Sequence, residues 1–187
     1  MKIFLIRHGE TDWTTAGKYC GHHDIPLNEI GKEQARQAGL QLLNEPLSAV
    51  FSSPLTRAKE TAEIALAVAQ HHHLPIQEIP ELKEIHFGVL SGFTYEQALE
   101  RHADWYSQWL NNPFATTPPG GESFTDFSTR VLRSWEQILT SGADSVAVFS
   151  HGGAIRILMA HHQGIPLNQS RDIRQDPGQV NIIEVNS

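Results

Sequence analysis

The sequence predicts an α/β protein, a three-layer α/β/α sandwich whose central sheet is mostly parallel. Two observations carry this prediction. Short apolar runs alternate along the chain with segments of helical periodicity, as they do where helices cover both faces of a parallel sheet. The chain has 187 residues, which is long enough for one globular domain with a core and short for two domains. Its 40% hydrophobic and 19% charged residues are ordinary for a globular protein. We therefore expect a single domain over residues 1–187.

Five apolar runs are predicted strands. They are KIFLI, SAVFSS, LPIQEI, SVAVFS and QVNIIEV, at residues 2–6, 48–53, 74–79, 145–150 and 179–185. A short apolar run bounded by polar residues is typical of a strand that is buried on both faces. SVAVFS fits this pattern best, and LPIQEI fits it least.

Three helix starts have a signal in the sequence. Asn28 is a candidate N-cap, because its side chain can accept a hydrogen bond from the first-turn amides. Ser53 and Pro54 predict a second start, with a capping residue followed by proline at the first helical position. Thr94 opens the sequence TYEQ, which has the pattern of a capping box.

The predicted helices carry apolar residues at spacings of three and four, which places those residues on one face. We expect these faces to be buried, and the aromatic side chains among them to serve packing rather than the stacking of bases. The five sets are Ile30, Ala35, Ala38 and Leu42; Ala58, Ala62, Ala65 and Ala69; Tyr95, Leu99, His102, Tyr106 and Trp109; Phe124, Phe127, Val131, Trp135 and Ile138; and Ala154, Ile155, Leu158 and Met159.

Chemically active residues follow three of the predicted strands. Arg7 and His8 end the first strand, His151 follows SVAVFS, and Arg57 comes shortly after SAVFSS. Ligands of open α/β sheets bind beyond the carboxyl ends of the strands. If these strands are neighbours, the side chains converge on one crevice. Taken alone, Arg7 and His8 would also fit a strand end with a solvated arginine and a core histidine.

Such a crevice suits a phosphate monoester. Arginines such as Arg7 and Arg57 match the geometry of a phosphoryl group with paired N–H donors. Backbone amides at the predicted helix start Gly152-Gly153 can bind the same anion. An unprotonated imidazole is a competent nucleophile near neutral pH, and a carboxylic acid would protonate the leaving alkoxide.

Six segments of the chain resemble the sequence motifs of a known protein family. They are LIRHGETDW, GHHDIPLNEIGKEQA, FSSPLTRAKETA, ELKEIHFGVLSG, GGESF and FSHGGAIRIL. In order and approximate spacing they resemble the histidine phosphatase superfamily, which includes the cofactor-dependent phosphoglycerate mutases. The resemblance implies that His8 becomes a phosphohistidine and that Glu84 donates the proton. It further implies that the phosphoryl group is held, without metal or cofactor, by Arg7, Arg57, His151 and the main-chain N–H of Gly152.

Other residues have less certain places in the family pattern. Glu84 is preferred to Glu81 as the acid because Leu82, Glu84 and Gly88 form the LxExxxG arrangement. Where this chain has Thr14 the family often has asparagine, so Thr14 is a candidate substrate contact of shorter reach. Gly21 and His22 belong to a loop that should flank the pocket. They are candidate substrate contacts too, and a solvated loop is the alternative.

Within the superfamily the short length, YCGHHDIPL and GGESFTDFSTRV resemble α-ribazole phosphatases, which remove a 5′-phosphate late in cobalamin assembly. We expect a small helical lid over about residues 91–121. That segment offers only Arg101 for a substrate carboxylate, and it holds an aromatic set that could pack on a flat base: Phe93, Tyr95, Trp105, Tyr106, Trp109 and Phe114. The alternatives are a broad-specificity sugar or nucleotide phosphatase, a phosphoglycerate mutase, and a non-catalytic phospho-ligand binding module.

The composition argues against several other classes of protein. A formal net charge of −7 disfavours nucleic-acid and anionic-membrane surfaces. No apolar run is long enough for a membrane helix or a signal peptide, so we expect a cytoplasmic protein. Cys20 is the only cysteine, and Pro26 stands where a cysteine phosphatase needs its arginine. The sequence leaves open whether the protein is a monomer or a dimer.

The run His71–His73 raises the hypothesis of a metal site. Three consecutive helical residues point about 100° apart, so they cannot all reach one ion, and positive charge is favourable near a helix C-terminus. We therefore prefer a solvated helix end, and predict no metal.

Overall fold

A single five-stranded sheet forms the centre of the computed structural model, which describes residues 1–185. The strand order is β3-β2-β4-β1-β5. Neighbours among the first four strands run parallel, and β5 runs antiparallel to β1. The strands are β1 (Lys2–Arg7), β2 (Ala49–Ser52), β3 (Ile76–Glu78), β4 (Ser145–Ser150) and β5 (Val180–Glu184). All five predicted strands are thus confirmed, as is the mostly parallel sheet.

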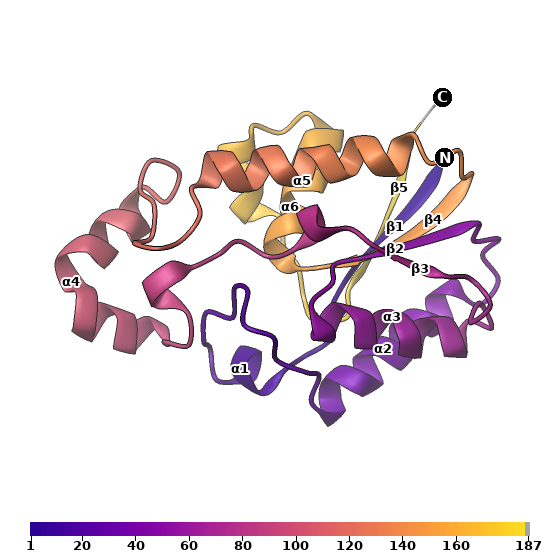
Figure 1. The fold of residues 1–187 in the computed structure, drawn as a ribbon, viewed down its shortest axis with the longest axis horizontal. Coiled ribbons are helices and arrows are strands. Elements are labelled where there is room, and N and C mark those ends of the chain that lie inside the picture. Colours follow the sequence, from indigo (N-terminus) through magenta and orange to yellow (C-terminus); the bar gives the residue numbers. More distant parts are fainter. Residues whose placement is uncertain (186–187) are drawn as a thin grey trace.

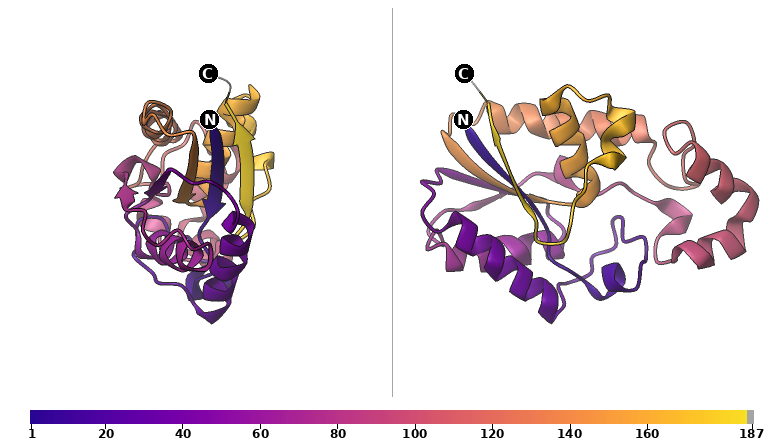
Figure 2. Two further views of the ribbon diagram at one scale, coloured as in Figure 1. Left: turned by 90° about the vertical axis from the view of Figure 1, so that its right-hand side faces the viewer. Right: turned by 180° about the vertical axis from the view of Figure 1, so that it is seen from behind.

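Helices cover both faces of the sheet. One face carries α2 (Glu29–Leu42) and α3 (Thr56–Val68), and the other carries α5 (Phe124–Leu139) and α6 (Gly152–Gln163), as Figures 1 and 2 show. The helix α4 (Tyr95–Asn111) lies beyond the carboxyl ends of the strands, at the opposite end of the molecule from the N-terminus (Figure 1). The remaining short elements are α1 (Asp12–Thr15) and the 3-10 turns η1 (Pro80–Leu82), η2 (Gly88–Leu90) and η3 (Leu167–Asp172).

The core has one apolar cluster on each face of the sheet. The strand β4 contributes to both, because successive side chains of a strand point to opposite faces. Val146 and Val148 pack with α5 and α6, whereas Ala147 and Phe149 pack with α2 and α3. A third, smaller cluster lies under α4 and includes Tyr106. The central strand is therefore fully buried, as the apolar run SVAVFS predicts.

Two of the three predicted helix starts are confirmed. The Asn28 side chain accepts from the Gly31 amide at 2.8 Å, and Thr94 and Gln97 form a capping box at the start of α4. The prediction at Ser53-Pro54 is wrong, because α3 begins at Thr56 and has no side-chain cap. The Ser53 hydroxyl lies instead 2.8 Å from Nε2 of His151, so a tertiary contact takes the place of the cap.

Most of the predicted apolar faces are buried, and three positions, Ile30, Tyr95 and Leu99, are exposed. Ile30 is 58% exposed. The inward position in the first turn of α2 belongs to Gly31, which lies so close to the backbone of Glu10 that a Cβ there would clash. In α4 the backbone departs from helical geometry at His102, so the predicted continuous face is broken and Leu99 is exposed.

Within the described residues, none of the helices combines the length and the apolar character that a membrane-spanning helix requires.

Candidate active site

The strand order brings the predicted site residues together. The strands β1 and β4 are neighbours, and the His8 amide donates to the carbonyl of Ser150 at 2.9 Å. The imidazole rings of His8 and His151 therefore meet with their centroids 5.1 Å apart. Because β2 lies on the other side of β4, Arg57 in the first turn of α3 reaches the same place. The predicted convergence of these side chains is confirmed.

The hydrogen bonds of His8 fix which ring nitrogen carries its proton. Nδ1 lies 2.6 Å from the carbonyl oxygen of Gly9. A carbonyl can only accept, so Nδ1 is the protonated nitrogen and Nε2 keeps its lone pair. Nε2 accepts from Nε of Arg57 at 3.3 Å. Burial, aided by the charges of Arg57 and Arg7, holds the pKa of His8 well below its usual value, so the ring stays neutral near pH 7.

Two arginines flank this ring, Arg57 buried and Arg7 partly buried. Arg57 is fully buried and donates to the carbonyls of Gly21 and His23, each at 2.8 Å. Arg7 donates to the carbonyl of Gln175 at 2.6 Å, and its buried Nε has no hydrogen-bond partner among residues 1–185. Neither guanidinium pairs with a carboxylate within the same residues. Burial lowers the pKa of both arginines, and their charges remain free to meet an anion.

His151 is the N-cap residue of α6 and is wholly buried. Its Nε2 pairs with Ser53, and its Nδ1 has no partner in the described part of the chain. Burial and then the charge of Arg57 lower the pKa of this histidine well below its usual value. Gly152 begins α6 next to it, and a Cβ at Gly152 would lie 3.5 Å from Nε of Arg7.

Glu84 lies in the segment after η1 and lines a cavity together with Arg7, His8 and Arg57. One carboxylate oxygen accepts from the Gly153 amide and the other from the Ile85 amide, each at 3.0 Å. A Cβ at position 153 would clash with this carboxylate, so Gly153 makes room for it. Glu84 lines the cavity, whereas Glu81 is not among its walls.

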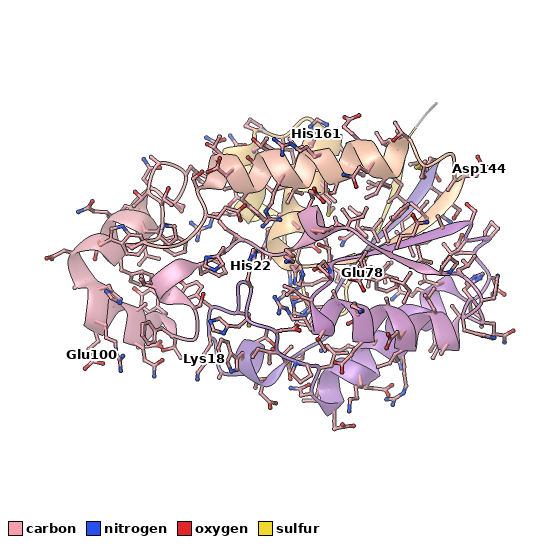
Figure 3. The ribbon with its side chains drawn as sticks, in the orientation of Figure 1. Lys18, His22, Glu78, Glu100, Asp144 and His161 are labelled. Carbon is pink, nitrogen blue, oxygen red and sulfur yellow. The ribbon has the colours of Figure 1, made fainter. Side chains whose placement is uncertain are left out.

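His8, Arg7, Arg57 and Glu84 line a cavity of about 180 Å³, whereas His151 and Gly152 are not among its walls. The sequence-predicted members of its wall are Arg7, His8, Thr14, Gly21, Arg57 and Glu84. Sequence reasoning missed four more, which are Lys18, Tyr19, Cys20 and Phe87. Three of these four directly precede Gly21 in one loop. Their position beside a predicted site residue is the signal in the sequence that could have identified them. Figure 3 shows Lys18 and His22 in the region between the sheet and α4.

Thr14 and His22 are both engaged by other protein groups. The Thr14 hydroxyl donates to the carbonyl of Thr11 and accepts from the amide of Thr11, each at 2.8 Å. His22 is not among the cavity walls. Its Nε2 donates to the carbonyl of Glu84 at 2.8 Å, and partial burial lowers its pKa. His22 thus supports the segment that carries Glu84.

A second, more apolar cavity of about 250 Å³ adjoins the first, and Tyr19, Glu84 and Phe87 line both. Of the six aromatic residues expected in the lid, only Trp109 and Phe114 line it. Arg156 lines it as well. The other walls include Ile85, Phe124, Phe127, Ile157 and Arg171. Phe124, Phe127 and both arginines come from outside the predicted lid, where sequence spacing gives no hint of them.

No group of three or more His, Cys, Asp or Glu side chains in residues 1–185 has an arrangement that could hold a metal ion. The run His71–His73 forms no such group. Its first and third rings lie with centroids 6.0 Å apart.

Comparison with known proteins decides the family. The family model of the histidine phosphatase superfamily (branch 1) matches residues 3–187. The chain belongs to the histidine phosphatase superfamily. An adenosylcobalamin/alpha-ribazole phosphatase of Escherichia coli (strain K12) is 35% identical over 187 residues, covering 100% of this chain and 91% of the relative. A metal-independent phosphoserine phosphatase of Arabidopsis thaliana is 36% identical over 181 residues, with 92% and 75% covered.

Solved structures of this superfamily share the fold. The crystal structure of the alpha-ribazole phosphatase from Shigella flexneri superposes with a TM-score of 0.92 at 34% identity. The superposition covers 100% of this chain and 91% of that one. The sandwich expected from the sequence is therefore the histidine phosphatase fold, and the resemblance of the six segments is confirmed.

Proposed function

We propose that this superfamily member is a phosphomonoester hydrolase that works through a phosphohistidine on His8. One observation carries the proposal. The bond from Nδ1 of His8 to Gly9 leaves the lone pair on Nε2, in contact with Arg57, in a cavity whose two arginines have no carboxylate partner in residues 1–185. A neutral imidazole beside guanidinium groups that have no carboxylate partner suits the binding and attack of a phosphoryl dianion.

The proposed reaction has two steps. The phosphoryl group binds between Arg7, Arg57 and the Gly152 amide, and Nε2 of His8 attacks phosphorus as the ester oxygen departs. Glu84 gives that oxygen its proton. In the second step Glu84, now a carboxylate, takes a proton from water as the water attacks the phosphohistidine. Inorganic phosphate leaves and His8 regains its lone pair.

His151 completes the charge balance. The free ring is neutral because burial and cationic neighbours lower its pKa. A bound phosphoryl dianion reverses that balance, since an opposite charge at contact distance favours the charged form. Its unpartnered Nδ1 then gains a proton and donates to an equatorial oxygen, while Nε2 stays on Ser53.

The second cavity supports a leaving group that carries a flat base, and α-ribazole 5′-phosphate is our first choice of substrate. Trp109, Phe114 and Phe127 offer apolar surface for a flat base, next to the proposed acid Glu84. Residues 91–121, which supply Trp109 and Phe114, would form a lid on the single domain. The full-length similarity to α-ribazole phosphatases supports the same choice.

The alternatives make different demands on this cavity. A broad-specificity sugar or nucleotide phosphatase would use the same phosphate site with little selection among leaving groups. A phosphoglycerate mutase needs cations that bind the substrate carboxylate. The lid segment supplies only Arg101, but Arg156 and Arg171 line the cavity and could serve. The aromatic walls of the cavity favour a substrate with a flat base over phosphoglycerate. A non-catalytic binding module has no need of His8 and Glu84 together.

Two experiments test the proposal. After rapid quenching of a reaction with a labelled phosphate ester, we expect an acid-labile, base-stable label on the protein that is absent from His8→Ala. A label that persists on the variant would exclude His8 as nucleophile. We also expect kcat/KM to be highest for α-ribazole 5′-phosphate among a panel with a ribonucleoside 5′-phosphate, a hexose phosphate and 3-phosphoglycerate. A flat profile would favour the broad phosphatase, and transfer between positions of phosphoglycerate would favour the mutase.

A further inference from the structure

Arg130 in α5 uses all five of its N–H donors, the full set that a guanidinium carries. Nε and Nη2 form a paired contact with the carboxylate of Glu122, at 2.6 and 2.8 Å. Nη1 donates to the carbonyls of Glu81 and Lys83, at 2.7 and 2.8 Å. Nη2 also donates to the carbonyl of Glu84 at 2.8 Å. Three of the five bonds therefore end on the backbone that carries Glu84.

The segment held in this way has few other restraints. Glu81 and Leu82 end the short 3-10 turn η1, and Lys83 and Glu84 follow it outside the strands and helices. The hydroxyl of Ser150 donates to the carbonyl of Leu82, at 2.7 Å, and His22 supplies a second donor to that of Glu84. Four consecutive carbonyls, from residue 81 to residue 84, are thus held by side chains rather than by a regular backbone ladder.

Glu122 extends the contact to the other side of Glu84. Besides pairing with Arg130, its carboxylate accepts from the His86 amide at 3.3 Å. The pair therefore contacts the backbone two residues after Glu84 as well as the residues before it. Both side chains are largely shielded, at 18% and 15% exposure, so solvent screens their interaction less than it screens a surface ion pair.

We propose that Arg130 and Glu122 are positioning residues that fix the carboxyl group of Glu84 for proton transfer. Neither lines the phosphate cavity, so they act through Glu84 and not on the reacting atoms. Among the described residues, the Glu84 carboxylate itself accepts two main-chain amide bonds, from Ile85 and Gly153. Its placement depends on where its own backbone lies, and misplacement of a catalytic group by about 1 Å can cost about 10²-fold in rate. The inference rests on the proposed role of Glu84 as the acid.

The variant Arg130→Lys tests the proposal with the charge retained. A lysine has three rotating donors and no planar fork, so it cannot hold Glu122 and three carbonyls together. We expect kcat for an alkyl 5′-phosphate to fall about 10- to 100-fold, in the range found when the partners that orient an active group are lost. For p-nitrophenyl phosphate, which needs little proton donation, we expect a change of less than about threefold. KM for both esters should stay within about twofold, since the phosphate site is untouched.

Arg133→Lys is the matched control, because Arg133 is an exposed arginine one turn further along the same helix. It should change neither kcat. Glu122→Gln is the second variant, since it keeps an oxygen acceptor and removes the charge. It should show the same dependence on leaving group as Arg130→Lys, with a smaller loss. The far-ultraviolet circular dichroism and melting temperature of each variant establish that the measured protein is folded.

Glu84→Gln separates this inference from the proposed function. If Glu84→Gln loses no more activity on the alkyl ester than on the aryl ester, Glu84 is not the acid and the proposed function fails. If Glu84→Gln discriminates while folded Arg130→Lys and Glu122→Gln lose equally on both esters, the positioning role is wrong. We expect the double variant Glu84→Gln/Arg130→Lys to match Glu84→Gln alone on the alkyl ester, since both changes act on one proton transfer.

Discussion

The hydroxyl oxygen of Ser53 lies 2.8 Å from Nε2 of His151. Ser53 comes directly after β2, and the same hydroxyl accepts from the Leu55 amide at 3.3 Å. The contact joins the ends of two neighbouring strands, β2 and β4. It holds the ring of His151 so that its other nitrogen, Nδ1, is the one left without a protein partner among residues 1–185.

Ser53→Ala should therefore reduce activity through the orientation of His151. A side-chain hydrogen bond is worth about 0.5–1.5 kcal/mol net, so we expect kcat/KM to fall roughly 3- to 10-fold and inorganic phosphate to inhibit more weakly. Ser134→Ala is the control. Ser134 is also fully buried and donates to a helix carbonyl, at 2.6 Å, and it lines neither of the two cavities. A similar loss of activity in both variants would show that stability rather than ring orientation is responsible.

The free energy of unfolding should rise with pH between about pH 5 and 6.5. The folded-state pKa values of His8 and His151 are depressed, so below the unfolded value of about 6.5 the unfolded chain binds more protons. Each histidine contributes a slope of at most about 1.4 kcal/mol per pH unit in that window, and about half of that at pH 6.5, so stability is lost as pH falls. The half-buried His22, whose pKa is also lowered, adds in the same direction.

Urea unfolding at several pH values measures this slope. In the double variant His8→Asn/His151→Gln the slope should be smaller, because two of the groups that titrate are gone. Saturating inorganic phosphate should flatten the slope of the unmodified protein, since the bound anion raises the pKa of His151. An unchanged slope in the double variant would contradict the assignment of these two histidines.

Activity should survive exhaustive chelation. In the proposed mechanism Arg7, Arg57 and the protonated His151 neutralise the phosphoryl group, and no step is assigned to a metal. The measurement is turnover of p-nitrophenyl phosphate before and after dialysis against excess EDTA, with Mg²⁺, Mn²⁺ and Zn²⁺ added back singly. A complete loss that one of these ions restores would require a different mechanism.

Tyr106→Phe should weaken the binding of a large leaving group. The hydroxyls of Tyr19 and Tyr106 lie 2.6 Å apart, so α4 is tied to a wall residue that the two cavities share. Burial and this bond raise the pKa of Tyr106. We expect KM for α-ribazole 5′-phosphate to rise about 3- to 10-fold, with kcat nearly unchanged.

Inhibition by inorganic phosphate should be unaffected in Tyr106→Phe, because the phosphate site does not include that residue. Tyr95→Phe is the matched control, since Tyr95 is 48% exposed on the same helix. If KM rises equally in both variants, the bond between Tyr19 and Tyr106 has no part in leaving-group binding.

Most of the secondary structure, and the residues proposed to bind the phosphoryl group, could be predicted from the amino-acid sequence alone. Apolar runs and three- and four-residue spacings are local consequences of burial, and the strand β4 shows this directly, since every residue of SVAVFS is buried. His8, Arg57 and His151 could be brought together on paper because parallel strands end at one edge of a sheet.

The residues that surround these predicted site residues are brought there by the tertiary structure and could not be predicted from the periodicity of the sequence. Ser53 looks like a helix cap in the sequence and instead contacts His151 across the sheet. Arg156, Phe127 and Tyr19 meet at the second, more apolar cavity from α6, α5 and a loop near the N-terminus, and Arg130 reaches the backbone of Glu84 from 46 residues away. Periodicity records which side of an element is buried, but it carries no information about which distant element covers it. Those contacts arise only when the packed layers fix the distances between them.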